Sequence, residues 1–507
     1  MPADAWPHCS SLASCPATDS SLLRPGAPGY PVNTSALLTG ALRLRKLAPV
    51  QRRAWCRALK LRSSTKVLVH TGGSLSQGRQ CGTPAGCTDR LFTSAACQGA
   101  GAVRAEDPMP SCSYGARVAN WLGAGYINRA AGGRTTRSMA PEFRTVPLVP
   151  REPGDTAVGG HGNATRSADI LLIDFSVNDY WQSGYQRALT PAVAKKLGMA
   201  PTSSLYDATV AATEALLRYA LDEHPHTALL LVGTVCPPAG APAPSHAAYA
   251  AVARHYGVAY LSFPSALTRG RAACAPGATP KVYSHDHHPD WVGHQYVADA
   301  IVQVLQGWPC RRHPPPQTLP RPPPQPSYGH PAPRLPPPLT AQRGYEVCRM
   351  PTAAYRAVEA MRRGGGLPGV TVRRGRWRAY EDVPGKAGWI AATADALIEF
   401  ELRTGPFRPS VSVVWVQGYS GWGSAELRLT PKGGASGRAA HVHVLDGRQP
   451  SGLRVTQAAA LSMTVGPNSP WKLGTNLDFV LSLRLLCEGR GTRGACPKFK
   501  LLSVESC

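Results

Sequence analysis

Four short segments of this chain place residue types that can support nucleophilic catalysis directly after apolar stretches or before a helical pattern. The segments are Gly72-Gly-Ser74, Asn128-Arg-Ala-Ala-Gly-Gly133, Asp174-Phe-Ser-Val-Asn178-Asp179 and Asp286-His-His288-Pro289. A serine hydroxyl is a poor nucleophile until a base removes its proton, and the oxyanion that it generates needs preorganised hydrogen-bond donors. Each segment alone is a weak signal, but their joint presence indicates a site for nucleophilic catalysis.

The order of these segments resembles the SGNH, or GDSL-type, hydrolase superfamily over roughly 220 residues. The resemblance implies that Ser74 is the nucleophile, His288 the general base and Asp286 the acid that orients the imidazole. It also implies an oxyanion hole formed by backbone N–H groups of Ser74 and Gly133 and by the side chain of Asn178. Neither a cofactor nor a metal ion is expected at this site.

Two positions depart from the family pattern. Gly73 precedes the candidate nucleophile where the name-giving motif has aspartate, although some members of the family carry glycine there. The usual acid lies three residues before the histidine, and this chain has His285 at that place, so Asp286 is one residue too close. Unless a tight turn brings the two side chains together, the spacing predicts a Ser74–His288 dyad.

Each segment also has a purely structural interpretation. Asn178 and Asp179 suit a turn that ends a strand, because both residue types hydrogen-bond to nearby backbone. Gly133 suits a backbone position with positive φ. Asp290 suits the N-cap of a helix that begins at Trp291. These structural interpretations do not explain why the four segments occur in this order. The order therefore favours the hydrolase interpretation.

A metal site is the alternative for the histidine-rich segment, because imidazoles and carboxylates at this density can bind zinc. The cluster comprises His285, Asp286, His287, His288, Asp290 and His294. Pro289 interrupts the HxHxDH spacing of binuclear hydrolases, and no second His/Asp cluster completes a site. His294 is expected to be a packing or capping residue of the last helix.

Apolar strand-like runs alternate with helical patterns in the first 308 residues, which indicates a parallel sheet covered by helices on both faces. The family resemblance makes this sheet flavodoxin-like. Strands are expected over 66–71, 168–175, 228–235 and 260–263, and helices over 116–122, 205–221, 247–255 and 291–305. Ligands of such sheets bind at the carboxyl ends of the strands, where Ser74 and Asn178 fall.

A proline-rich segment divides the chain, with 14 prolines and no acidic residue between Pro309 and Pro338. We predict a disordered segment over 1–35, a hydrolase domain over 36–308, a polyproline II linker over 309–344 and a β-sandwich-like domain over 345–507. Strands of the sandwich are expected over 396–403, 410–416, 425–429, 441–445 and 479–485.

The sandwich is rich in aromatic residues, which are expected mainly in its core. The alternative is a glycan-stacking platform beside the basic cluster Arg373–Arg378. The aromatic residues are Trp377, Trp389, Trp415, Tyr419, Trp422 and Trp471.

The chain has 55 basic and 30 acidic residues, a net charge of +25, which favours acidic partners. Without a nucleic-acid-binding motif, an acidic polysaccharide is preferred to nucleic acid. The 14 cysteines lack zinc-site pairs and indicate disulfides, with Cys81–Cys87 as the best single pairing. Sequons at Asn33 and Asn163 agree with secretion.

No transmembrane segment is expected. Residues 1–30 lack the apolar core of a signal peptide, so either the N-terminus lies upstream of this sequence or the compartment differs.

The sequence thus predicts a secretory-pathway serine esterase that cleaves an acetyl or acyl ester, with an acylated carbohydrate as the expected substrate. The same site would make the protein a carbohydrate O-acyltransferase if a sugar hydroxyl replaced water. The alternative from another class is a non-catalytic wall or matrix glycoprotein with a glycan-binding sandwich.

Overall fold

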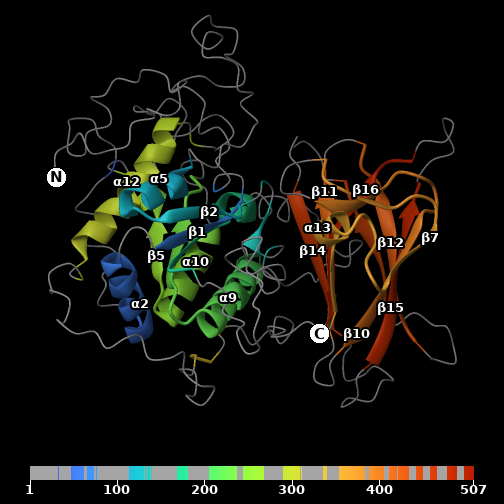
Figure 1. Cartoon of the computed structure of the whole chain (residues 1–507), viewed down its shortest axis with the longest axis horizontal. Coiled ribbons are helices and arrows are strands. Elements are labelled where there is room, and N and C mark those ends of the chain that lie inside the picture. Colours follow the sequence, from blue (N-terminus) through green and yellow to red (C-terminus); the bar gives the residue numbers. More distant parts are fainter. Residues whose placement is uncertain are drawn as a thin grey trace, which may run out of the picture. The chain divides into compact units, whose positions relative to one another are not determined.

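The computed structural model describes two compact units, one formed mainly by residues up to Ala341 and the other mainly by Gln342–Cys507. The described ranges are 47–61, 66–73, 113–130, 168–180, 205–236, 244–267, 291–308, 335–337, 353–382, 387–404, 410–418, 421–432, 441–448, 457–464, 477–487 and 496–506, with isolated residues such as Ser76, Cys310 and Leu339. Figure 1 shows helices around a small sheet in the first unit and strands throughout the second.

The first unit contains a five-stranded sheet with the order β2-β1-β3-β4-β5, in which all neighbouring strands are parallel. The strands are β1 (Val67–Gly72), β2 (Gly125–Asn128), β3 (Ile170–Asp174), β4 (Ala228–Gly233) and β5 (Ala259–Ser262). Every residue of β3 and β4 is buried, as expected for strands covered on both faces. The predicted flavodoxin-like parallel sheet is therefore confirmed.

The longer helices of this unit are α2 (Pro49–Lys60), α5 (Tyr114–Leu122), α9 (Leu205–Glu223), α10 (Pro244–Tyr256) and α12 (Trp291–Gly307), with the short α11 (Phe263–Ala266) after β5. Side chains of α2, α5 and α12 share one apolar cluster with alternate residues of the strands, such as Leu68 and Leu230. Helix α10 packs against β4 and β5. Sequence reasoning found neither α2 nor β2.

A disulfide joins Cys56 of α2 to Cys310, which follows α12, across 254 residues of sequence. Beside it, the rings of Trp55 and Trp308 meet edge to face with centroids 4.9 Å apart. The bond therefore closes the α/β unit from its first long helix to its last. Near the start of the chain, Val32 is buried and forms a bridge with Leu267.

The second unit is built from two antiparallel sheets with strand orders β13-β12-β15-β10-β7 and β14-β11-β16-β9-β8, with β6 paired to β16. The strands are β6 (Ala353–Arg356), β7 (Val370–Arg374), β8 (Arg378–Tyr380), β9 (Gly388–Ala391), β10 (Leu397–Thr404), β11 (Ser410–Gln417), β12 (Ser424–Pro431), β13 (His441–Asp446), β14 (Gln457–Thr464), β15 (Leu477–Leu486) and β16 (Phe499–Ser506). A short helix, α13 (Ala357–Arg362), follows β6.

Alternate side chains of the two sheets form one apolar core, so the sheets pack face to face. Phe400 of β10 and Phe479 of β15 are completely buried in it. Four of the tryptophans are also buried, namely Trp377, Trp389, Trp415 and Trp422. The expectation that these aromatics belong to the core is confirmed for those four, whereas Tyr419 and Trp471 lie outside the described residues.

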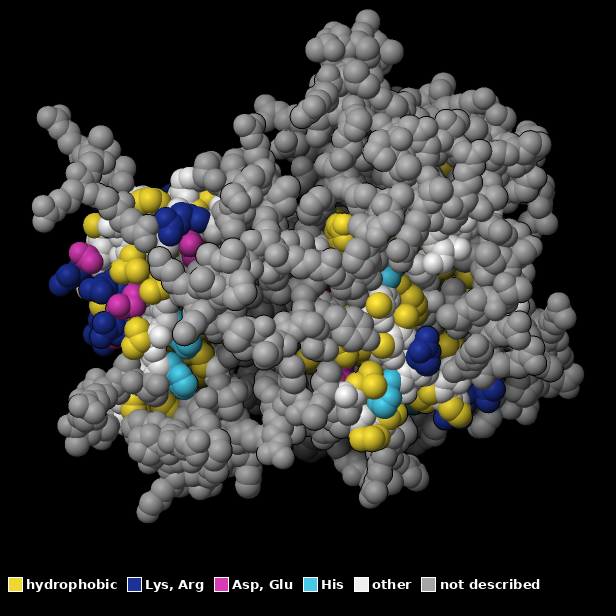
Figure 2. Space-filling view, turned by 180° about the vertical axis from the view of Figure 1, so that it is seen from behind, with side chains coloured by type: hydrophobic (Ala, Val, Ile, Leu, Met, Phe, Trp, Pro, Cys, Tyr) yellow, Lys and Arg dark blue, Asp and Glu magenta, His cyan; other side chains and the backbone are white. Residues whose placement is uncertain are grey.

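The outer face of the sheet β13-β12-β15-β10-β7 carries charged side chains in pairs. Figure 2 shows basic and acidic side chains close together on the surface of this unit. Arg428 and Arg484 both contact Glu426, at 2.7 and 3.2 Å. Arg373 of the basic cluster contacts Glu399 at 2.7 Å. Since Trp377 of the same cluster is buried, it does not offer an exposed ring to a sugar.

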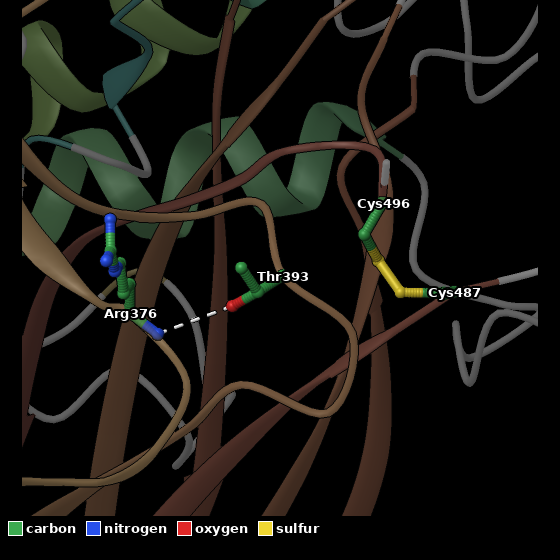
Figure 3. Close-up of a disulfide and its surroundings, with 4 residues drawn as sticks. All are labelled: Arg376, Thr393, Cys487 and Cys496. Carbon is green, nitrogen blue, oxygen red and sulfur yellow. Dashed lines mark hydrogen bonds between the residues drawn. A yellow bond between two sulfur atoms is a disulfide. The ribbon is translucent and has the colours of Figure 1, made fainter. Parts of the chain in front are cut away.

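A second disulfide, Cys487–Cys496, closes the connection between β15 and β16 (Figure 3). The same view shows the backbone N–H of Arg376 donating to Thr393 Oγ1 over 3.3 Å, a bond between two turns of this unit. All five cysteines among the described residues, the fifth being Cys236, are disulfide-bonded. Cys81 and Cys87 lie outside the described residues. Within the described part of the chain, no helix is long and apolar enough to cross a bilayer.

Candidate active site

The turn after β1, which contains Ser74, is attached to the end of β3 on both sides of the serine. The backbone N–H of Gly73 and the hydroxyl of Ser76 both donate to the carbonyl oxygen of Asp174, each over 3.0 Å. A Cβ atom at Gly72 would lie 2.1 Å from that same oxygen, so only glycine permits this approach. Ser74 itself lies outside the described residues, but Gly73 and Ser76 both bind the carbonyl oxygen of Asp174.

Asn128, at the end of β2, is the first residue of the predicted segment Asn128–Gly133 and binds Ser76. Its side-chain amide donates to the carbonyl oxygen of Ser76 over 2.9 Å, and its side-chain oxygen accepts from the backbone of Ala130 over 2.9 Å. Asn128 therefore connects the chain leading toward Gly133 to the turn around Ser74. Gly133 lies outside the described residues.

The side chain of Asp174 accepts four hydrogen bonds in a completely buried position. Oδ1 accepts from the backbone N–H and the hydroxyl of Ser176, at 3.0 and 2.7 Å. Oδ2 accepts from the hydroxyls of Thr234 and Tyr114, at 2.5 and 3.1 Å. Burial raises the pKa of Asp174, and the hydrogen bonds from Thr234, Ser176 and Tyr114 act in the opposite direction.

Ser176 connects Asp174 to the helical turn that carries Asn178. Asn178 is the one predicted oxyanion-hole residue that the structure describes. The Ser176 hydroxyl accepts from the backbone N–H groups of Thr234 and Val235, at 2.9 and 3.0 Å, and so joins the helical turn 176–180 to the end of β4. Asn178 lies half-buried on that turn. The turn that carries Asn178 is thus held between β3 and β4.

The next residue along this turn, Asp179, is buried and adds a second attachment. Its Oδ2 accepts from the hydroxyl of Tyr249 on α10 over 2.9 Å. The same hydroxyl accepts from the backbone N–H of Phe175 over 3.2 Å. The segment from Phe175 to Asp179 is therefore bound to α10 at both of its ends.

A chain of hydrogen bonds between buried side chains runs from Asp174 back to β1 through Tyr114 and His70. His70 Nε2 lies 2.9 Å from the Tyr114 hydroxyl, and His70 Nδ1 lies 3.1 Å from the Tyr126 hydroxyl. Burial lowers the pKa of His70 to about 3, so the ring is neutral at physiological pH. Burial also raises the pKa of Tyr114.

The direction of this chain follows from the single proton on each hydroxyl. Because Tyr114 donates to Asp174, it must accept from His70, which therefore carries its proton on Nε2. The bare Nδ1 then accepts from Tyr126, whose oxygen is 2.7 Å from Ser113 Oγ. The arrangement fixes one tautomer of His70 and makes it a structural rather than a catalytic group.

Tyr114 also links this chain to the helix that follows the predicted base. Its backbone N–H, one of the four donors left unpaired at the start of α5, donates to His294 Nδ1 over 3.3 Å. The two rings are stacked with centroids 6.0 Å apart. The interpretation of His294 as a packing residue is confirmed.

The described structure thus joins three of the four predicted segments directly and reaches the helix after the fourth. Ser74, Gly133, Asp286 and His288 lie outside the described residues, as do His285, His287 and Asp290, so their roles stay predictions. Among the described residues, no group of three or more His, Cys, Asp or Glu side chains is placed to bind a metal ion.

Sequence reasoning missed the residues that organise this site. They are His70, Tyr114, Asp174, Ser176 and Thr234, all of them buried. A signal was present for two of them, because His70 and Asp174 are polar residues within runs expected to form fully buried strands. A polar residue in such a strand must find hydrogen-bond partners.

One solved structure of similar fold agrees with this architecture. A two-domain esterase active on acetylated mannans, co-crystallised with mannopentaose, is similar in fold, with a TM-score of 0.50, 17% identity, and coverage of 89% of this chain and 92% of that chain. A putative lipolytic protein of the G-D-S-L family from Desulfitobacterium hafniense gives a TM-score of 0.26 and 11% identity, covering 47% of this chain and 99% of that chain. No curated protein sequence matches this chain.

The family model of the GDSL-like lipase/acylhydrolase family matches residues 72–296. The match begins at the glycine that permits the contact between β1 and β3, and it ends within α12. It therefore includes all four predicted segments and the buried hydrogen bonds around Asp174. Residues 72–296 form a domain of the GDSL-like lipase/acylhydrolase family.

Proposed function

We propose that this protein is a serine esterase that removes an acetyl or acyl group from a carbohydrate through an acyl-enzyme on Ser74. The observation that carries this proposal is the attachment of Gly73 and Ser76 to one carbonyl oxygen, that of Asp174. A nucleophile between two such anchors is presented at the carboxyl ends of the parallel strands, where ligands of these sheets bind.

In the proposed reaction Ser74 Oγ attacks the ester carbonyl carbon while its proton passes to His288. The oxyanion is stabilised by the N–H groups of Ser74 and Gly133 and by the Asn178 amide. The tetrahedral intermediate collapses, the C–O bond to the sugar breaks, and His288 returns the proton to the departing hydroxyl. Water, deprotonated by His288, then attacks the acyl-enzyme and releases the acid.

A carbohydrate ester is the substrate class that we favour. The esterase of similar fold is described as active on acetylated mannans, and its coverage extends over both units of this chain. The net charge of +25 would also attract a polysaccharide that carries acidic groups. Five disulfide-bonded cysteines support an oxidising compartment and therefore a secreted protein.

Covalent labelling with a fluorophosphonate probe tests the serine mechanism. We expect wild-type protein to react and to hydrolyse small acetyl esters, and Ser74→Ala to lose both properties. Ser482→Ala is the control, because Ser482 lies on β15 of the sandwich and takes no part in the candidate site. It should label at Ser74 as the wild type does.

Two results would contradict the proposal. Retained turnover in Ser74→Ala would exclude the serine as nucleophile. A folded wild-type protein without labelling or turnover on acetylated oligosaccharides would favour the non-catalytic glycoprotein.

A further inference from the structure

The end of the proline-rich segment lies against helices α9 and α10 of the α/β unit. Arg218 Nη1 donates to the carbonyl oxygen of Pro336 over 2.8 Å, and His255 Nε2 lies 2.8 Å from the carbonyl oxygen of Pro337. The backbone N–H of Leu339 donates to Glu214 Oε1 over 2.6 Å. All three contacts are made to main-chain atoms of the segment.

The receiving side chains are held in place by one another. The Tyr256 hydroxyl donates to Glu214 Oε1 over 2.6 Å and accepts from Arg218 over 2.9 Å. The Arg218 guanidinium also lies 5.8 Å from the centre of the Tyr256 ring. Glu214 and Tyr256 are each only 3% exposed, so these atoms are preorganised within the unit.

The arrangement of donors and acceptors matches the chemistry of a proline triplet. Pro336, Pro337 and Pro338 have no backbone N–H and offer only carbonyl oxygens, for which Arg218 and His255 supply donors. The first N–H after the triplet belongs to Leu339, and it meets the carboxylate of Glu214. Polyproline II segments leave their carbonyl groups free for such contacts.

We infer that Glu214, Arg218, His255 and Tyr256 form a docking site for a polyproline II segment, occupied by residues 335–337 and 339 of the same chain. We call these four side chains the linker dock. Cys310, at the start of the proline-rich segment, is bonded to Cys56 of the same unit. The linker is therefore anchored near both of its ends, and residues 340–352 separate the docked segment from β6 in the sequence.

The dock has a consequence for the reach of the second unit. A tether of residues 340–352 spans at most roughly 45 Å when fully extended, at about 3.4 Å per residue. If the segment left the linker dock, the connection between the two units would run from Cys310 to β6 and would be longer. A longer connection lowers the effective concentration of one unit near the other. The inference is independent of the proposed esterase activity.

Hydrogen exchange of the full-length protein tests the dock, because Leu339 carries the first amide N–H after the triplet. Contacts with charged groups contribute about 1.5–3 kcal/mol each, so exchange at Leu339 should accelerate at least about tenfold in Glu214→Gln and in the double variant Arg218→Gln/His255→Gln. Arg254→Gln, exposed on α10 beside the dock, is the control and should leave exchange unchanged. Equal protection of Leu339 in all these proteins would overturn the inference.

Limited digestion with trypsin gives a second readout. The Arg334–Leu335 bond adjoins the docked residues, whereas the Arg343–Gly344 bond lies beyond them and serves as the internal reference. Leu339→Pro removes the N–H that Glu214 accepts without changing either helix, and it should accelerate cleavage at Arg334 relative to Arg343 by about tenfold. An unchanged ratio, with amides of α9 and α10 still protected, would show that no dock holds the linker.

Discussion

The two units bury polar groups in different ways. In the α/β unit, His70, Tyr114 and Asp174 are inaccessible and form a continuous chain at the carboxyl ends of the strands. In the sandwich, the space between the sheets is filled by apolar side chains, such as Phe400 and Phe479, and most of its ion pairs lie on exposed surfaces.

This difference separates a unit with a mainly apolar interior from one in which buried polar side chains organise the candidate site. Burying neutral hydrogen-bonded groups contributes little net free energy and costs much if one partner is lost. Such a chain does fix orientation, and here it fixes Ser76 and the helical turn that carries Asn178 relative to each other. In the sandwich, the bond between the two sheets from the Ser506 hydroxyl to the carbonyl oxygen of Arg403 is made to the backbone over 2.7 Å.

The largest expected effect concerns the disulfides, which close loops of very different length in the two units. In the chain-entropy model, loss of Cys56–Cys310 costs about 5 kcal/mol of unfolding free energy and loss of Cys487–Cys496 about 3 kcal/mol. The sequence separations are 254 and 9 residues. Hydrogen exchange resolved by unit, in Cys→Ser double variants, measures both. A larger loss in the sandwich would contradict the loop-length argument.

The second prediction compares a buried carboxylate with an exposed one. Asp174→Asn replaces an accepting oxygen by an NH2 group that faces hydrogen-bond donors. We therefore expect the free energy of unfolding of the α/β unit to fall by about 3 kcal/mol and kcat to fall about 10²-fold. Glu426→Gln, whose partners Arg428 and Arg484 lie at the surface, should cost under about 1 kcal/mol.

Denaturant unfolding and ester turnover measure both variants of this pair. A structural role alone would lower stability but leave kcat of the folded protein unchanged. That outcome would show that Asp174 does not position Asn178 for catalysis. Comparable losses of stability in the two variants would remove the distinction between the units.

The smallest effect concerns pH. Burial lowers the pKa of His70 to about 3, against the ordinary value of 6.5 for an unfolded histidine. Below pH 6.5 the unfolded state therefore takes up a proton that the folded state does not, so the free energy of unfolding falls as the pH falls from 6.5 toward 3. The slope is at most about 1.4 kcal/mol per pH unit. The raised pKa of Asp174 acts with the opposite sign, because its folded form holds a proton more tightly.

His70→Gln isolates the histidine, since glutamine can both donate and accept in its place. The unfolding free energy of the variant should depend less steeply on pH between 6.5 and 4 than that of the wild type. His443, half-buried on the edge strand β13, provides the control in His443→Gln. Identical slopes in wild type and His70→Gln would show that His70 is not kept neutral by burial.

The regular elements of the chain could be predicted from local pattern. The expected strands at 228–235 and 410–416 differ from β4 and β11 by only one or two residues at most ends, because long apolar or alternating runs identify buried strands. The predictions missed the helices α2, α11 and α13 and the strands β2, β6, β7, β8, β9, β14 and β16. Strand β2 has only four residues, too few to show a period, and β16 is buried on both faces and shows no alternation.

The sequence by itself determined the type of fold and the match of residues 72–296 to the GDSL-like family, since these depend on residue order and local periodicity. Only the tertiary structure decided the roles of His70, Tyr114 and Asp174, whose contacts span 44 and 60 residues. It also decided the pairing of Cys56 with Cys310 and the docking of Pro336 on Arg218. The physical reason is that hydrogen bonds and disulfides between distant segments depend on which side chains the folded sheet brings together, and no local pattern encodes that proximity.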